Sequence, residues 1–319
     1  MTRSRLAPGA GIVTVPGAGP VLRSPEGEFL RIDTGGVDGD VLVRRLTGEA
    51  EAASGDPHDD RLHRLIDAFE ADGYAVVSSP RPPLDGRVVH VLGDPALAEP
   101  LARCVRGEGA EVRPITRDGV AELALTGPGD EHAEGRVAVV WCLDSPVAEG
   151  VWDAADRLPD HRVAWLRCHR EGAHVWTEPL AAAPGDVSSR HVRLRRLAAT
   201  PAHRELAAYW AGHRTPDTGP HPTDASAALI AALLTADLIA WADADADADA
   251  DVDVDVEGGA GSGRVRRAGL PVGRRLRRID LRDLTVTEHP VLPVPDVAPL
   301  PTGARPGPHA GNGTGKARS

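Results

Sequence analysis

The sequence VAVVWCL at residues 137–143 and the sequence VAWLRC at residues 163–168 decide the fold. Both runs are apolar and rich in β-branched or aromatic residues, which predicts strands buried on both faces, as in a parallel sheet. Between them, residues 146–158 have apolar side chains at helical spacing, so the region predicts a strand–helix–strand unit with a right-handed crossover. A third strand is expected at 174–180, followed by a helix with Ser188 as its N-cap. These elements predict an α/β fold.

The segment before these strands has the order of a nucleotide-binding unit without its phosphate loop. Residues 87–92 predict a strand, and Gly93 stands where a Gly-x-Gly-x-x-Gly pattern has its first glycine. The second and third glycine positions hold Pro95 and Ala98, and proline has no N–H to offer a phosphate. Asp94 as an N-cap before Pro95 explains the sequence without a ligand. We therefore expect a doubly wound α/β domain that has lost its nucleotide site.

The first eighty residues predict a separate small domain. Residues 21–32 hold two apolar segments around a turn-forming Ser-Pro-Glu-Gly tetrad and predict a hairpin. Apolar spacing predicts helices at 37–46 and 60–71, and residues 74–77 predict a closing strand. This is a winged-helix-like pattern. Its middle helix would have to come from residues 48–57, which are rich in Glu, Ala and Gly.

A proline-rich linker divides the chain of 319 residues into two domains. The linker at 80–84 is stiff, so we expect a winged-helix-like domain at 17–80 and the α/β domain at 85–301. Residues 1–16 are expected to be a disordered lead-in. The Gly- and Pro-rich residues 302–319 are expected to be a disordered tail.

The net charge of −11 comes largely from one tract. From Ala242 to Glu257, Asp alternates with Ala and then with Val, and a Gly-rich stretch follows. Repulsion between like charges predicts a disordered insert at 242–263. Without this tract the chain is close to neutral, so bulk charge gives no reason to expect nucleic-acid binding.

The N-terminus and the cysteines indicate a cytoplasmic protein. Residues 1–5 lead into Gly and Pro without the apolar segment of a secretion signal, and we expect neither a transmembrane span nor a membrane partner. Cys104, Cys142 and Cys168 have neither metal-ligand nor disulfide spacing. Two of them lie in predicted core strands, where a thiol behaves as a small apolar group.

Two stretches of the second domain resemble a known family. EGAHVWTEPLAAAPG at 171–185 precedes the helix with a basic run, and HPVLPVP lies at 289–295. They resemble the ocin-ThiF-like (E1-like) half of proteins that assist azole formation in ribosomally made peptides, the TOMM class of RiPP products. VLRSPEGEFLRID at 21–33, before DVLVRRLTG at 40–48, resembles the RiPP recognition element fused to that half. The resemblance covers 17–301 outside the acidic insert.

The resemblance implies a protein that binds the leader segment of a precursor peptide. In this family the leader adds as a strand beside the third strand, against the last helix. Carried onto this sequence, the leader-binding residues are Glu28, Phe29, Leu30, Arg31 and Ile32 on the strand and Leu62, Leu65 and Phe69 on the helix. The alternative is that the three helix residues are simply core. The implied partner enzyme is a YcaO-type cyclodehydratase, to which this chain would present the precursor for thiazoline or oxazoline formation.

Two other functions stay open on the sequence: an E1-like enzyme that still uses ATP or zinc, and a winged-helix DNA-binding regulator. The family carries two Cys-x-x-Cys pairs, but these positions hold Ser188 with His191 and Val297 with Leu300. Since two of the four positions have no ligand atom, we expect no zinc and no other cofactor.

The sequence gives little support to the remaining candidate metal cluster or to DNA binding by the last helix of the first domain. His169, Glu171 and His174 lack the i, i+4 spacing of the helical zinc motif. We assign no catalytic residue and expect a non-catalytic partner protein. The helix at 60–71 carries more acidic than basic residues and would repel phosphate.

Overall fold

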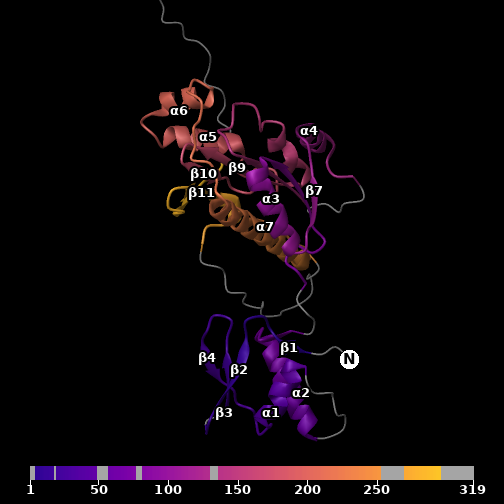
Figure 1. Cartoon of the computed structure of the whole chain (residues 1–319). Coiled ribbons are helices and arrows are strands. Elements are labelled where there is room, and N and C mark those ends of the chain that lie inside the picture. Colours follow the sequence, from indigo (N-terminus) through magenta and orange to yellow (C-terminus); the bar gives the residue numbers. More distant parts are fainter. Residues whose placement is uncertain are drawn as a thin grey trace, which may run out of the picture.

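The computed structural model describes residues 4–17, 19–48, 57–76, 81–129, 136–252 and 269–295. Figure 1 shows a small N-terminal domain and a larger α/β domain. Most of the expected middle helix at 48–57, the distal part of the acidic insert and the tail at 302–319 lie outside the described residues.

The N-terminal domain contains a three-stranded antiparallel sheet in the order β2 (Gly11–Val15), β3 (Gly19–Arg23), β4 (Phe29–Arg31). The β3–β4 hairpin lies within the predicted hairpin. A second pair joins β1 (Arg5–Leu6) to β5 (Ala75–Val76). Residues 5–15 therefore form strands instead of the expected disordered lead-in. The Gly and Pro in this segment argued against strands, and the pairing with β3, in which Ile12 lies opposite Leu22 and packs on the core, could not be predicted from it.

Two helices cover one face of this sheet. Helix α1 (Gly39–Thr47) begins at Asp38, whose side chain accepts from the Asp40 N–H at 2.8 Å, and ends at Gly48, where φ is 82°. Glycine adopts this left-handed conformation at no steric cost. Helix α2 (Pro57–Ala71) packs its apolar stripe on the same core. The buried core residues are Leu22, Val37, Leu42, Leu46, Leu62, Ile66, Phe69 and Ala75.

The second domain is built on a seven-stranded mixed sheet in the order β12-β11-β10-β9-β8-β6-β7. Its strands are β6 (Val88–Gly93), β7 (Glu111–Pro114), β8 (Val137–Leu143), β9 (Ala164–Glu171), β10 (His174–Thr177), β11 (Arg275–Asp280) and β12 (Val286–Pro290). Strands β7, β6, β8 and β9 are parallel, and the remaining pairings are antiparallel. The two runs that decide the fold are the central strands β8 and β9.

Helices pack on both faces of the parallel strands, which confirms the doubly wound α/β fold. They are α3 (Pro95–Gly107), α4 (Arg117–Thr126), α5 (Ser189–Ala198), α6 (His203–Trp210) and α7 (Asp224–Val252), with the 3-10 helices η1 (Ala155–His161) and η2 (Val272–Arg274). One core lies between the sheet and α3 with α7, and a second lies between the sheet and α4 with η1.

Two expectations for the second domain were wrong. Residues 146–158 do not form an α-helix: turns lead into the short η1, because Gly150 takes a φ of 83° and Pro159 lies inside η1. The acidic insert does not begin at 242, because α7 continues to Val252. Alanine favours a helix, and Arg87 anchors the extension by donating to Asp245 at 2.6 Å and to the Ala242 carbonyl at 3.2 Å.

Helix α7 is the core helix of the second domain. Among the described residues it alone is long and apolar enough, by length and composition, to cross a membrane. In the structure, however, Ile230, Leu234 and Leu238 are fully buried against the sheet and α3. The buried carboxylate of Asp237 pairs with Arg277 of β11, with Arg277 Nη2 lying 2.9 Å from Asp237 Oδ1.

We predict that Asp237→Ala will strongly destabilise the second domain, because Arg277 would keep its buried charge with Glu288 as its remaining partner. The expected loss is about 3 kcal/mol. All six tryptophans lie in this domain, so urea unfolding followed by tryptophan fluorescence reports on it alone. As a control, Arg282→Ala removes an exposed partner of Asp280 and should cost much less stability than Asp237→Ala. Equal losses in both variants would contradict a dominant role for the buried pair.

Candidate functional site

The first candidate site is a groove between α2 and the segment that follows β4, in the N-terminal domain. It has a volume of about 370 Å³ and opens to solvent. Its lining residues come from the segment after β4 and from one stripe of α2: Asp33, Thr34, Gly35, Arg61, Arg64, Leu65 and Ala68.

Strand β4 borders this groove and forms an edge of its sheet. Among the described residues it pairs only with β3. Its outer backbone N–H and C=O groups are therefore available to a further strand. Leu30 is 37% exposed, although it lies on the core side of the sheet opposite Leu22. An apolar side chain and an unpaired strand edge thus lie side by side.

The register divides the five predicted strand residues between two faces. Leu30 and Ile32 lie on the side of the helices, and Ile32 packs at the border of the core. Phe29, which is 64% exposed, and Arg31 lie on the opposite face, in register with Arg23 and Val21. Glu28 belongs to the turn, where its N–H donates to the Ser24 hydroxyl at 3.2 Å.

The three predicted helix residues are also divided. Leu62 and Phe69 are buried in the core, as the alternative to peptide binding anticipated, whereas Leu65 is half-buried and lines the groove. Sequence reasoning missed Arg61, Arg64 and Ala68. Their i, i+3, i+7 spacing marks a single helix stripe beside the apolar one and could have identified them.

The second candidate is the carboxyl edge of the parallel strands, where doubly wound sheets bind nucleotides. A Cβ on Gly93 would lie 1.7 Å from the Cys142 carbonyl oxygen, so strand packing requires this glycine without any phosphate. Asp94 holds the predicted N-cap position before Pro95 at the start of α3, but its side chain makes no capping hydrogen bond. The Asp94 carboxylate accepts from the backbone N–H of Asp144 at 2.6 Å, which joins the ends of β6 and β8.

An ionic network fills the adjacent edge of the sheet. The buried Arg170 of β9 donates to Asp144 and, at 2.7 Å, to Asp217. Burial lowers the pKa of Arg170, but Asp144 and Asp217 outweigh this effect, so that the pKa is raised. His221 Nδ1 lies 2.6 Å from the second Asp144 oxygen. The segment carrying Asp217 and His221 thus lies over the point where a nucleotide would enter.

We predict that the chain does not bind ATP, because Asp94 and Asp144 add negative charge where phosphates would lie and Pro95 offers no N–H. Isothermal titration of the full chain with Mg-ATP should give no saturable heat up to about 1 mM, which corresponds to a free energy weaker than about −4 kcal/mol. Micromolar affinity would favour the adenylating alternative.

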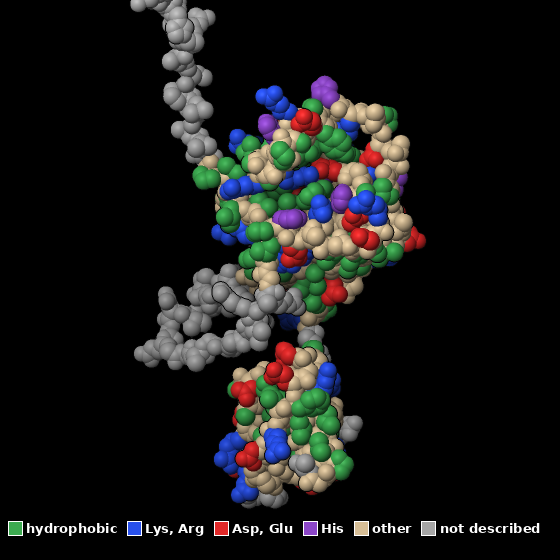
Figure 2. All heavy atoms as spheres, turned by 90° about the vertical axis from the view of Figure 1, so that its left-hand side faces the viewer, with side chains coloured by type: hydrophobic (Ala, Val, Ile, Leu, Met, Phe, Trp, Pro, Cys, Tyr) green, Lys and Arg blue, Asp and Glu red, His purple; other side chains and the backbone are tan. Residues whose placement is uncertain are grey.

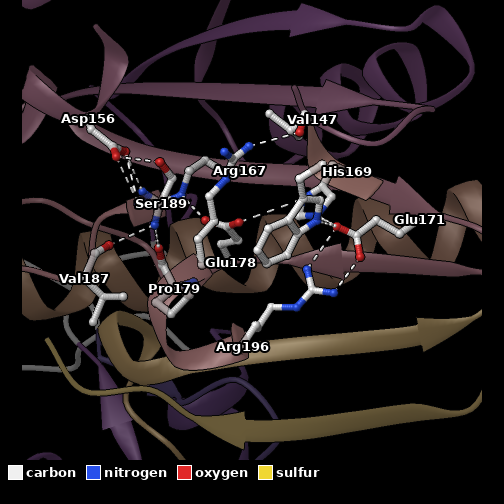
Figure 3. Close-up of polar contacts among 12 residues, drawn as sticks. Val147, Asp156, Arg167, His169, Glu171, Glu178, Pro179, Val187, Ser189 and Arg196 are labelled. Atoms are coloured by element: carbon white, nitrogen blue, oxygen red, sulfur yellow. Dashed lines mark hydrogen bonds and ion pairs between the residues drawn. The ribbon is translucent and has the colours of Figure 1, made fainter. Parts of the chain in front are cut away.

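A third group of polar residues lies inside the second domain and is drawn in Figure 3. The fully buried Arg167 donates from Nη1 to Asp156 at 3.1 Å, and its Nε lies 3.0 Å from Glu178 Oε2, outside good hydrogen-bond geometry. Burial raises the pKa of Glu178. Asp156 also accepts from the Ser189 N–H at 3.0 Å, so η1, β9 and the start of α5 are held together.

Glu171 is the centre of the other half of this group. It accepts from Arg196 of α5, from Trp210 Nε1 of α6 at 2.7 Å, and lies 3.2 Å from His169 Nε2. Burial raises the pKa of Glu171, but the hydrogen bonds and charges of His169 and Arg196 outweigh it and hold the pKa below its usual range. Glu171 therefore ties both helices to the sheet (Figure 3).

The sequence candidates for metal binding have other partners here. His174 Nε2 lies 3.4 Å from Asp280, away from His169. Ser188 and His191 form a capping box at the start of α5: each side chain accepts from the backbone N–H of the other residue. Within the described residues no three His, Cys, Asp or Glu side chains converge as a metal site. Val297 and Leu300 lie outside the described residues.

We predict that Glu171 makes the second domain sensitive to acid. Because its pKa is lower in the folded state than in the unfolded chain, its contribution to stability is complete at neutral pH. This contribution begins to be lost as pH falls below about 5 and continues to be lost until the folded-state pKa is reached. The wild type should therefore lose more stability than Glu171→Gln between about pH 7 and pH 4, as measured by urea unfolding. Equal losses would contradict this role. Glu205→Gln on the exposed face of α6 is the control.

Comparison with known proteins places the fold. No family model matches the chain, and no curated protein matches it significantly. A solved heterocyclase in complex with substrate and cofactor is similar over 92% of this chain and 39% of its own, with a TM-score of 0.62 and 10% identity. The heterocyclase TruD is similar over 92% of this chain and 42% of its own, with a TM-score of 0.61 and 13% identity.

The shared fold supports the α/β assignment made from the sequence. At 10% and 13% identity the likeness concerns the fold alone. The chain spans about two fifths of the length of these heterocyclases.

Proposed function

We propose that this chain binds the leader segment of a ribosomally made precursor peptide and presents it to a separate YcaO-type cyclodehydratase. The observation that carries the proposal is the unpaired edge of β4 beside the groove that Leu65 and Ala68 of α2 line. An extended peptide can use both features at once. Its backbone pairs with the strand, and alternate side chains enter the groove.

The charges of the groove suit a leader that combines apolar and acidic residues. Arg61 and Arg64 line it next to Leu65 and Ala68, and only one carboxylate, Asp33, is among the lining side chains. Asp33 already accepts from the Gly35 N–H at 3.0 Å. Apolar contacts would supply affinity, and the arginines would favour carboxylates over other polar groups.

The second domain supports the part of the proposal in which a separate protein carries out the ring-forming chemistry. Its nucleotide edge is closed by the Asp94–Asp144 contact and by the network around Arg170. The two heterocyclases of shared fold are more than twice as long as this chain, so a separate partner would supply the remaining part. In this proposal the ring-forming chemistry belongs to that partner, and this chain supplies substrate binding.

We predict that Leu65→Glu and Ala68→Glu each weaken leader binding by about tenfold or more, because the longer, charged side chain would fill part of the groove and compete with the leader's carboxylates for Arg61 and Arg64. The full chain is titrated into a fluorescent leader peptide encoded beside its gene, and anisotropy is recorded. Ala68 is exposed, so its variant should keep the wild-type melting temperature even if Leu65→Glu does not.

Phe29→Glu is the matched control. It introduces the same charge on β4 but on the opposite face of the sheet, so leader affinity should change by less than about twofold. Equal losses for Phe29→Glu and Ala68→Glu would argue against the groove. If the folded chain ignores the leader but binds promoter DNA from the same gene cluster, the regulator alternative replaces this proposal.

A further inference from the structure

A second open groove lies on the α/β domain, between helices α5 and α6 and the outer face of strands β10 to β12. Its volume is about 530 Å³. The lining residues are Trp176, Arg195, Arg196, Leu206, Leu276, Arg278, His289 and Val291, with Ala199, Thr200 and Pro290. Figure 2 shows hydrophobic side chains on this side of the larger domain, bordered by Lys or Arg and by His.

The floor of the groove is apolar. Leu276 and Val291 are buried beside Trp176, and Leu206 adds a half-buried side chain from α6. Leu292, which is 59% exposed, continues the apolar surface beyond Val291. An apolar strip of this kind is suited to side chains of a partner.

The rim of the groove is cationic, and two of its arginines, Arg195 and Arg278, have no described counter-charge, whereas Arg196 is paired with Glu171. Arg195 donates to the carbonyl oxygens of Leu292 and Pro293, at 3.2 and 3.1 Å, and to no carboxylate among the described residues. Arg278 is exposed and has no ion pair within the described part of the chain. The nearby carboxylate of Glu288 lies on the other face of the strand, where it pairs with Arg277.

We infer that this groove binds an acidic, extended segment of a protein partner. Alternate side chains of such a segment would contact the apolar floor, while its carboxylates would pair with Arg195, Arg278 and His289. Strand β12 is the edge of the sheet in the described structure, so the backbone of the segment has a strand to follow. The positive rim is notable on a chain of net charge −11 and supplies charge complementarity to an acidic partner.

Two other occupants fit less well. Nucleic acid would need an open aromatic face for base stacking, but the guanidinium of Arg196 covers the ring of Trp176 at 4.0 Å from its centroid. The chain's own C-terminal residues follow Pro295, and they carry Arg305, Lys316 and Arg318 against one carboxylate side chain, Asp296. A basic segment would be repelled by the rim.

The test uses the full chain and a fluorescein-labelled octapeptide of alternating Glu and Val. Saturable binding is expected by anisotropy at low salt, and Arg278→Glu should weaken it by about tenfold. His289→Glu is the second variant, should Arg278→Glu fail to fold. Arg103→Glu makes the same charge change on the exposed face of α3 and should leave affinity within about twofold of wild type.

Each remaining outcome overturns the inference. It is wrong if the peptide does not bind below about 1 mM, or if Arg103→Glu and Arg278→Glu cost the same. It is also wrong if an oligonucleotide of equal charge binds more tightly at this site. An increase in peptide affinity after Asp251, Asp253 and Asp255 are changed to Asn would assign the groove to the chain's own acidic tract. The Ala68→Glu variant of the first groove should leave this binding unchanged, which separates the two proposals.

Discussion

The packing of the second domain depends on one constraint: the charged side chains that β9 buries must be paired. Arg167 and Arg170 are almost fully inaccessible, and an unpaired charge at such a position would cost several kcal/mol. Each therefore recruits a partner from elsewhere in the chain. Arg167 takes Asp156 from η1 and Glu178 from the segment after β10, whereas Arg170 takes Asp144 from the end of β8. These pairings fix the positions of η1, of the segment after β10 and of the segment after β8.

This constraint has opposite consequences on the two faces of β9, near its C-terminal end. On one face, Glu171 at the end of the strand ties α5 and α6 to the sheet. These helices then form one wall of the groove that Arg195 and Arg278 line. On the other, Arg170 draws the segment of Asp217 over the nucleotide edge. The same strand that positions a binding surface therefore closes the place where related architectures hold a nucleotide.

Much of this architecture could be predicted from local sequence signals. The runs at 137–143 and 163–168, the Asp94–Pro95 helix start and the Ser188 cap all act within a few residues, and the structure has each in place. The expectations that failed depend on distant partners. Strand β2 is fixed by its register with β3, and the extension of α7 by Arg87, which is more than 150 residues away.

The groove that Leu65 lines shows the same limit of prediction from sequence, at the level of single residues. The sequence identified the regions of β4 and α2, but it could not show which of Leu62 and Leu65 lies in the core and which in the groove, because both fit one apolar stripe. Only the packed core decides that Leu62 is inside and that Leu65 reaches the groove. The residues that flank Leu65 in the groove, Arg61 and Arg64, are charged and carry no apolar signal.

Among the sheet edges of the described structure, β4, β7 and β12 differ in how they are protected. An exposed edge next to apolar surface invites unwanted pairing, and proteins commonly protect such edges with charge or proline. Strand β7 is protected in this way, because it carries Glu111 and Arg113 and ends at Pro114. Strand β12 likewise carries Glu288 and ends at Pro290, whereas β4 keeps exposed Phe29 and Leu30 beside a groove. In the two proposals a partner segment would pair with β4 or follow β12, and both grooves would offer that segment arginine side chains next to apolar ones.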